Sequence, residues 1–222
     1  DLGEVLPMIL PRIPNSYPLP SVYTDEEIRA ILGSIDRSTV QGSRDFAILM
    51  LASSLGIRAS DICEMTLEAI NFVKNELSFI QKKTSVPLTL PLLPDVKEAL
   101  LGYLGYRKID STDEPIFIQC RAPYHKLTRM GIWTIMRRYV KQSGVDPGHR
   151  KRGTHALRSS LASSMVREQV PYYAVQKILG HESPQSTKNY VRIDIGRLRE
   201  FTLPVPEAYG RFDAFLKGGE TR

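Results

Sequence analysis

The chain has very little cysteine and no long hydrophobic run, and both absences restrict what it can be. Cys63 and Cys120 are the only cysteines among 222 residues, with no CxxC spacing and no paired histidines nearby. We therefore expect neither a disulfide framework nor a zinc site, and a reducing, cytoplasmic environment is the default. No apolar stretch approaches the roughly 18 residues that a membrane span requires, and the N-terminus lacks a signal-peptide pattern.

Internal repeats and low-complexity segments are also absent, and acidic residues are in the minority. With 42% hydrophobic residues the chain can bury one sizeable core, so we expect one large domain with tails. A formal charge of +6 favours a polyanionic partner, although a generic basic surface explains the charge equally well. Basic residues cluster in "MRRYVK" and "HRKRG", and we predict phosphate contacts from Arg137, Arg138, Lys141, Arg150, Lys151 and Arg152.

The two ends of the chain differ from its middle. Residues 1–23 carry five prolines and little periodicity, which is typical of an extended interdomain linker. The first residue is Asp, so we interpret the sequence as part of a longer protein. Residues 24–195 are predicted to form the main domain, and residues 196–222 a C-terminal tail that is too apolar for a frayed end.

Most of the main domain has helical periodicity. The predicted helices cover residues 24–35, 43–57, 59–70, 94–107, 128–143 and 171–180. Two more are predicted, one that starts at Thr154 and bears His155 and Arg158, and one that leads from Ser183 to Tyr190. Thr24, Thr128 and Thr154 are predicted N-caps, and Trp133 is placed on the apolar face of its helix. Residues 76–83 and 86–92 alternate apolar and polar side chains, as in a β-hairpin. The expected fold class is mostly α with a small antiparallel β-sheet (α+β).

A set of cationic and titratable side chains lies at the boundaries of these elements. Arg58 follows a buried helix, Lys83 lies at the hairpin tip, and His155 and Arg158 share one face of a helix near its N-terminus. His181 follows a helix end. Such a set suits a phosphodiester, because forked donors hold the non-bridging oxygens and titratable groups transfer protons. No acidic cluster that could bind a metal accompanies it.

Tyr190 adds a nucleophile to this set. A phenol can attack phosphorus and form a covalent intermediate once its proton is accepted and the developing charge is held. We interpret Tyr172, Tyr173 and Tyr209 as packing residues, because only Tyr190 has the nine-residue spacing from His181.

The blocks that carry these residues resemble the catalytic domain of the tyrosine recombinases, the phage-integrase family. The matching stretches are "GIRASDICEMT", "QKKTSVPLTLPL", "THALRSSLAS" and "ILGHESPQSTKNY", in the family's order over residues 24–195. The resemblance implies that family's catalytic-domain fold. It also implies DNA cleavage and rejoining through a 3′-phosphotyrosine at Tyr190, with no metal ion, ATP or other cofactor.

Specific roles follow from the resemblance. Arg58, Arg158 and His181 would stabilise the pentavalent phosphate, while His155 would assist proton transfer to or from the tyrosine. Lys83 would protonate the departing 5′ oxygen. Its neighbour Lys82 remains an alternative, because on a strand adjacent side chains point to opposite faces and only one can reach the phosphate. Asp61 would brace the site, or would pair with Arg58 for stability alone.

The expected activity is that of a site-specific recombinase of integrase or transposase type, acting in integration and excision of a mobile element. Its partners would be double-stranded DNA and further copies of itself in a synaptic tetramer, in the cytoplasm at a nucleoid. Residues 196–222 would dock on a neighbouring protomer or pack on their own domain. The alternatives are a type IB topoisomerase, a chromosome-dimer-resolving recombinase, and a binding module without catalysis, although no catalytic residue is missing.

Overall fold

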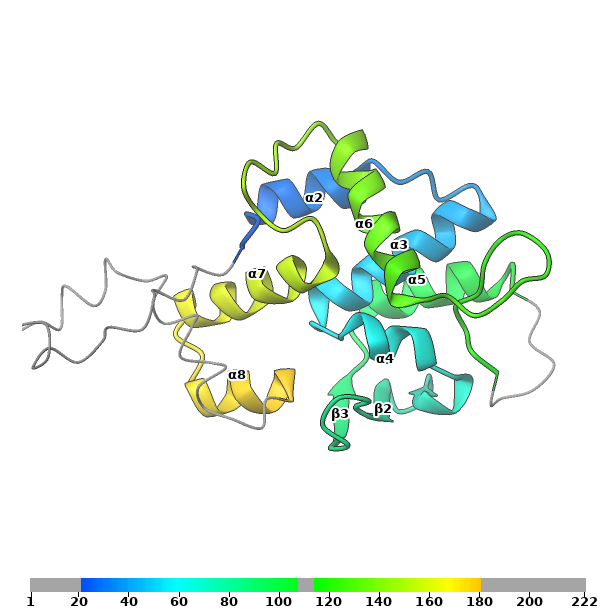
Figure 1. The fold of residues 1–222 in the computed structure, drawn as a ribbon. Coiled ribbons are helices and arrows are strands. Elements are labelled where there is room, and N and C mark those ends of the chain that lie inside the picture. Colours follow the sequence, from blue (N-terminus) through cyan, green and yellow to red (C-terminus); the bar gives the residue numbers. More distant parts are fainter. Residues whose placement is uncertain (1–20, 108–113, 181–222) are drawn as a thin grey trace, which may run out of the picture.

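The computed structural model describes residues 21–107 and 114–180, and its architecture is mostly helical with one small antiparallel sheet (Figure 1). In chain order the elements are α2 (Asp25–Gly33), α3 (Val40–Ser54), α4 (Ala59–Glu64), the 3₁₀ helix η1 (Leu67–Ala69), β1 (Ile70–Asn71), β2 (Glu76–Ile80), β3 (Pro87–Pro91), α5 (Pro94–Leu104), α6 (Arg129–Gln142), α7 (Thr154–Arg167) and α8 (Tyr172–Leu179). The predicted fold class is confirmed. No helix in the described ranges combines the length and apolarity that a bilayer crossing demands.

Helix α3 forms the centre of the core. Its residues Ala47 to Ala52 are buried almost without interruption, because the helix is apolar on nearly every side after its first turn. It packs against α5 and α7, and Figure 1 shows it in the middle of the helical layer, near α6. The chain leaving this rigid helix at Ser54 carries Arg58 only a few residues later.

The sheet has the order β1-β2-β3, with antiparallel neighbours. Its inward positions include Leu77 on β2, which pairs with Leu90 on β3, and both side chains are buried. Strand β1 was not predicted, because residues 59–70 were read as one helix. That prediction is wrong beyond Glu64: the chain passes through η1 instead, and Ile70 then pairs with Leu77.

Three threonines were predicted to be helix N-caps, and two of these predictions are confirmed. Thr24 forms a full capping box with Glu27, and Thr128 accepts a hydrogen bond from the Gly131 amide. Thr154 does not cap α7: Gly153 is the N-cap, and Thr154 is the buried first residue of the helix. Helix α3 starts three residues earlier than expected, since Thr39 caps it.

Two further residues lie elsewhere than expected. Trp133 is exposed instead of lying on the buried face of α6. Arg137 stacks on its ring, and Gly153 lies so close that an added Cβ there would be 3.0 Å from the indole. Tyr23, assigned to the linker, belongs to the core: its amide donates to Ser160 Oγ on α7 over 2.7 Å. The end of the proline-rich segment is therefore anchored on α7.

Candidate active site

Arg58 is placed by a sharp turn at the end of α3. Gly56 adopts a φ of +64°, which strains any residue with a side chain, and Arg58 becomes the N-cap of α4 two residues later. A Cβ at Gly56 would lie 2.7 Å from Leu179 Cδ2. Glycine therefore allows both the turn and the close approach of the α8 end to Arg58.

Arg158 reaches the same place from α7. Its side chain is 3% exposed, and its guanidinium donates to the carbonyls of Gly56 and Leu179. Arg58 Nη2 donates to the next carbonyl along, that of Gly180, over 3.2 Å. Two arginines that are 100 positions apart in sequence thus converge on the C-terminal end of α8, which lies beside α7 (Figure 1).

This junction has an unused cationic donor. Arg58 Nη1 is buried and has no hydrogen-bond partner within the described part of the chain. The Gly180 carbonyl oxygen satisfies one donor of Arg58 without neutralising the charge of the guanidinium. Because buried charges are normally paired, an anion is the expected occupant.

Lys82 and Lys83 lie in the turn between β2 and β3, not on a strand, so strand alternation does not decide between them. Lys82 Nζ is held by Glu64 at 2.5 Å. Lys83 is exposed, and its charge is one of those that act on His155. The ion pair with Glu64 therefore engages Lys82, and the choice of Lys83 as the catalytic lysine stays a prediction.

The His155 imidazole, in the first turn of α7, is surrounded by cations. Partial burial lowers its pKa below the usual 6.5, and the charges of Arg158, Lys151, Arg58 and Lys83 lower it further, in that order. Although the residue retains exposed surface, both effects disfavour the imidazolium. Near neutral pH His155 is therefore a neutral imidazole that can accept a proton.

Asp61 supports the turn that carries the two lysines. It is buried on α4, and its Oδ1 accepts hydrogen bonds from the Lys82 amide at 2.9 Å and from Ser60 Oγ at 3.3 Å. Within the described ranges Asp61 and Arg58 form no ion pair, and Asp61 Oδ2 has no partner. The contacts therefore favour a bracing role over the alternative of an ion pair with Arg58.

A basic cavity of about 460 Å³ adjoins the turn. It is lined by four cations against one carboxylate, namely Lys82, Lys83, Lys126, Arg129 and Glu64. Glu64 binds both Lys82 and Lys126, at 2.5 and 2.6 Å. Lys126 and Arg129 were not predicted from the sequence, because they lie between the motif stretches and line the cavity only in the folded chain.

The six cations predicted to touch phosphates differ in their exposure and in their contacts within the protein. Arg137, Lys141, Lys151 and Arg152 have exposed side chains. Arg150 instead forms a fork with Glu27, with N–O distances of 2.6 and 2.7 Å, and its guanidinium lies 4.4 Å from the centre of the Tyr23 ring. These contacts favour a structural role for Arg150.

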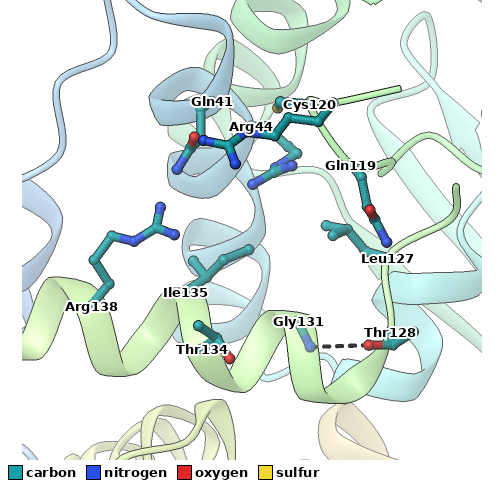
Figure 2. Close-up of a pocket in the computed structure, with 11 residues that line it drawn as sticks. Gln41, Arg44, Gln119, Cys120, Leu127, Thr128, Gly131, Thr134, Ile135 and Arg138 are labelled. Carbon is teal, nitrogen blue, oxygen red and sulfur yellow. Dashed lines mark hydrogen bonds between the residues drawn. The ribbon is translucent and has the colours of Figure 1, made fainter. Parts of the chain in front are cut away.

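Arg138, the sixth cation, borders a second pocket of about 370 Å³ between α3, α6 and the segment around Cys120 (Figure 2). Arg44 enters this pocket from α3, and Figure 2 shows it across the pocket from Arg138. Asp45 lies behind them, fully buried, and accepts hydrogen bonds from Arg44, Arg138 and Tyr139. This arginine cluster therefore contains its own counter-ion.

Two predicted catalytic residues, His181 and Tyr190, lie outside the described residues. Gly180 ends the described segment in the left-handed region, with a φ of +59°. Of the other four, Arg58 and Arg158 meet at the end of α8, and their charges, with that of Lys83, act on His155. No group of three or more His, Cys, Asp or Glu side chains suited to a metal occurs in residues 21–107 and 114–180.

Comparisons with known proteins identify relatives of the chain. The "Putative integrase/recombinase y4gC" of Sinorhizobium fredii is 34% identical over 189 residues, which are 85% of this chain and 97% of that protein. Tyrosine recombinase XerA of Pyrococcus furiosus is 30% identical over 86% of this chain and 63% of its own length.

Among solved structures, the XerH site-specific recombinase bound to its palindromic difH substrate has a TM-score of 0.68 at 21% identity. The likeness covers 82% of this chain and 52% of the XerH chain. The chain thus spans nearly all of one relative but only half to two thirds of the other two. The phage integrase family matches residues 21–197, and on that extent the chain belongs to the phage integrase family of tyrosine recombinases.

Proposed function

We propose that this chain is the catalytic part of a site-specific DNA recombinase that cuts and rejoins strands through a 3′-phosphotyrosine. The observation that carries the proposal is the convergence of Arg58 and Arg158 at the end of α8, where Arg58 Nη1 is buried and has no partner among the described residues. A neutral imidazole, His155, and an exposed ammonium, Lys83, adjoin it. These are the groups that a phosphoryl transfer to a phenol requires.

The proposed reaction is an exchange of esters. The Tyr190 hydroxyl oxygen attacks phosphorus, and neutral His155 assists the removal of its proton. The bond from phosphorus to the 5′ oxygen breaks, and Lys83 protonates that oxygen. Arg58 and Arg158, together with His181, hold the non-bridging oxygens while negative charge develops on them. The phosphotyrosine retains the ester bond, so the reverse attack by a 5′ hydroxyl rejoins a strand without ATP.

Double-stranded DNA is the proposed partner. The basic cavity beside the turn, the exposed cations of α6 and the loop at 149–153 supply positive charge on the side where the reacting phosphate would bind. The difH-bound state of XerH supports a DNA substrate for this chain as well. Strand exchange requires more than one active site, so we propose a homo-oligomer on DNA, a synaptic tetramer in which residues 196–222 dock between protomers.

The biological setting that we propose is integration and excision of a mobile element, with the protein acting in the cytoplasm at the nucleoid. Similarity to a protein named integrase/recombinase supports this assignment. A topoisomerase-like enzyme would relax a single duplex unaided, whereas this proposal requires a defined site and a second duplex. The two can be separated by supplying one or two duplexes in the same reaction.

Covalent trapping tests the proposal directly. A pool of nicked duplexes with a randomised core would be incubated with the protein, and adducts that survive denaturation would be sequenced on the DNA side. We expect enrichment of a defined core and mass-spectrometric mapping of the nucleotide to Tyr190. The variant Tyr190→Phe should bind the enriched duplex with unchanged Kd yet form no adduct. Adducts that persist in this variant, or that map to another side chain, would refute the nucleophile.

A further inference from the structure

Gln81 is a buried polar residue in a position that an apolar side chain would normally take. It directly follows β2, where Leu77 and Phe79 point inward, and it continues their period-2 phase. Its side chain is 1% exposed, whereas the preceding residue, Ile80, is largely exposed. A glutamine buried at an inward strand position costs free energy unless both ends of its amide are satisfied.

Both ends of the Gln81 amide are satisfied, each by a different part of the site. Its Oε1 accepts a hydrogen bond from Thr84 Oγ1 at 2.8 Å, inside the turn that carries Lys83. Its Nε2 donates to the Leu179 carbonyl at 3.4 Å, at the end of α8. The Gln81 backbone also closes the turn, because its carbonyl accepts from the Ser85 amide at 2.8 Å.

The carbonyl that Gln81 contacts is one that an arginine also uses. Arg158 Nη2 donates to the same Leu179 oxygen. The next residue, Gly180, packs so tightly on the Gln81 amide that a Cβ there would lie 2.3 Å from Oε1. Gln81 therefore joins two elements: the lysine-bearing turn on one side and the arginine-bound end of α8 on the other.

From these contacts we infer that Gln81 is a positioning residue, which sets Lys83 at a fixed distance from the guanidinium of Arg158. The inference rests on the proposed function, since it concerns how the proton donor is aimed at the 5′ oxygen. The turn is otherwise exposed, and Lys83 is on its surface. Without the Gln81 amide, Asp61 would still hold the Lys82 end of the turn, but the turn would lose its tie to the end of α8, and the Lys83 ammonium would no longer be kept in reach of the leaving oxygen.

A change of leaving group separates this role from a general structural one. Gln81→Met keeps the length of the side chain and removes both hydrogen bonds. On ordinary DNA at saturating concentration we expect strand cleavage to fall about 10- to 100-fold, the scale for a misplaced catalytic group. With a 5′-bridging phosphorothiolate the leaving sulfur needs no proton, so the variant should cleave at nearly the wild-type rate.

Controls make the result specific. Gln142→Met removes a comparable amide donor, 2.7 Å from the Ser34 carbonyl and far from the turn, and should cleave both substrates as wild type does. Thr84→Val removes only the hydroxyl bond to Gln81 and should show the same substrate pattern as Gln81→Met, with a smaller loss. An equal loss on both substrates, or no loss on either, would overturn the inference.

Amide exchange supplies a readout that does not depend on cleavage. The Ser85 amide should exchange faster in Gln81→Met than in wild type or Gln142→Met, because the turn loses its tie to α8. Unchanged exchange would contradict the positioning role whatever the activity. If wild-type protein formed no covalent adduct but the turn loosened as expected, the proposed function would fail while the structural role of Gln81 would stand.

Discussion

Two arginine clusters, one at Arg44 and Arg138 and one at Arg58 and Arg158, differ in their hydrogen-bond partners. Arg44 and Arg138, which border the pocket in Figure 2, share the carboxylate of Asp45, which is 0% exposed and also accepts from Tyr139. Arg58, at the other cluster, bonds to a carbonyl oxygen and keeps one buried donor unpartnered. Among the described residues, Arg44 and Arg138 are therefore paired with a carboxylate, whereas Arg58 forms no ion pair.

The presence or absence of a paired carboxylate distinguishes an arginine that stabilises the fold from one that can bind an anionic ligand. Burial and the charge of Asp45 raise the pKa of Tyr139 to about 12, so the phenol stays a donor and the network around Asp45 is closed. The Gly180 carbonyl instead orients the Arg58 guanidinium without neutralising its charge. Charge balance, more than burial, thus distinguishes the two clusters.

The largest expected effect is that one cluster controls DNA cleavage and the other controls stability. Arg58→Ala should reduce adduct formation about 100- to 1,000-fold, the scale for one lost donor to a developing oxyanion, with little loss of stability. Arg44→Ala should destabilise the fold by about 3 kcal/mol, because Asp45 loses its principal partner in a buried site, while folded molecules remain active. Urea unfolding gives the stability of each variant, and covalent trapping gives its rate of adduct formation.

The reversed pattern would break the comparison. If Arg58→Ala unfolded the protein as readily as Arg44→Ala and cleaved DNA normally, both clusters would be structural. Arg58→Lys offers a conservative variant: it keeps the charge but loses the fork, so partial recovery of cleavage would identify charge as one component.

Glu64 provides an intermediate case, since it is a carboxylate within a basic cavity but is partly exposed, with a side chain 39% accessible. Glu64→Gln should release Lys82 and Lys126 for DNA phosphates and strengthen non-specific binding several-fold. The slope of log K against log salt should become steeper by up to about 2 units, because two more cations can displace counter-ions. Fluorescence anisotropy with a generic duplex measures both quantities; an unchanged slope would place these lysines away from the DNA.

A smaller effect concerns the titration of His155. Burial, followed by the charges of Arg158, Lys151, Arg58 and Lys83, lowers its pKa, so the imidazole should still be neutral when the pH falls to its usual 6.5. The acid limb of cleavage at limiting DNA should therefore lie below that pH. An NMR titration should show the pKa rising in Arg58→Ala and staying unchanged in Arg138→Ala. A shift in the second variant would contradict the separation of the clusters.

Local sequence signals predicted much of the fold. The capping box at Thr24, the cap at Thr128 and the glycine after α8 are short-range patterns, and each marks a helix end in the structure. Where the sequence was misread, tertiary contacts decided: β1 exists because Ile70 pairs with Leu77, and Thr154 is buried at the start of α7 instead of capping it.

The candidate catalytic residues could be predicted from the sequence, but the residues that hold them in place could not. Arg58, Lys83, His155 and Arg158 came from motif spacing, and the fold brings Arg58 and Arg158 together at the end of α8. Gln81 carried a usable signal, a polar residue at an inward phase of β2, yet its partner at Leu179 is 98 residues away. No sequence pattern links such distant segments.

Charge neutralisation of the reacting phosphate tests the central claim most directly. Once trapping has identified the cleaved position, a methylphosphonate there replaces one charged non-bridging oxygen with a methyl group. If Arg58 and Arg158 stabilise the charge that develops on the phosphate, Arg58→Ala should lose far less activity on this neutral substrate than on the ordinary diester. An equal loss on the two substrates would contradict the account, because the guanidinium would then act through something other than the phosphate charge.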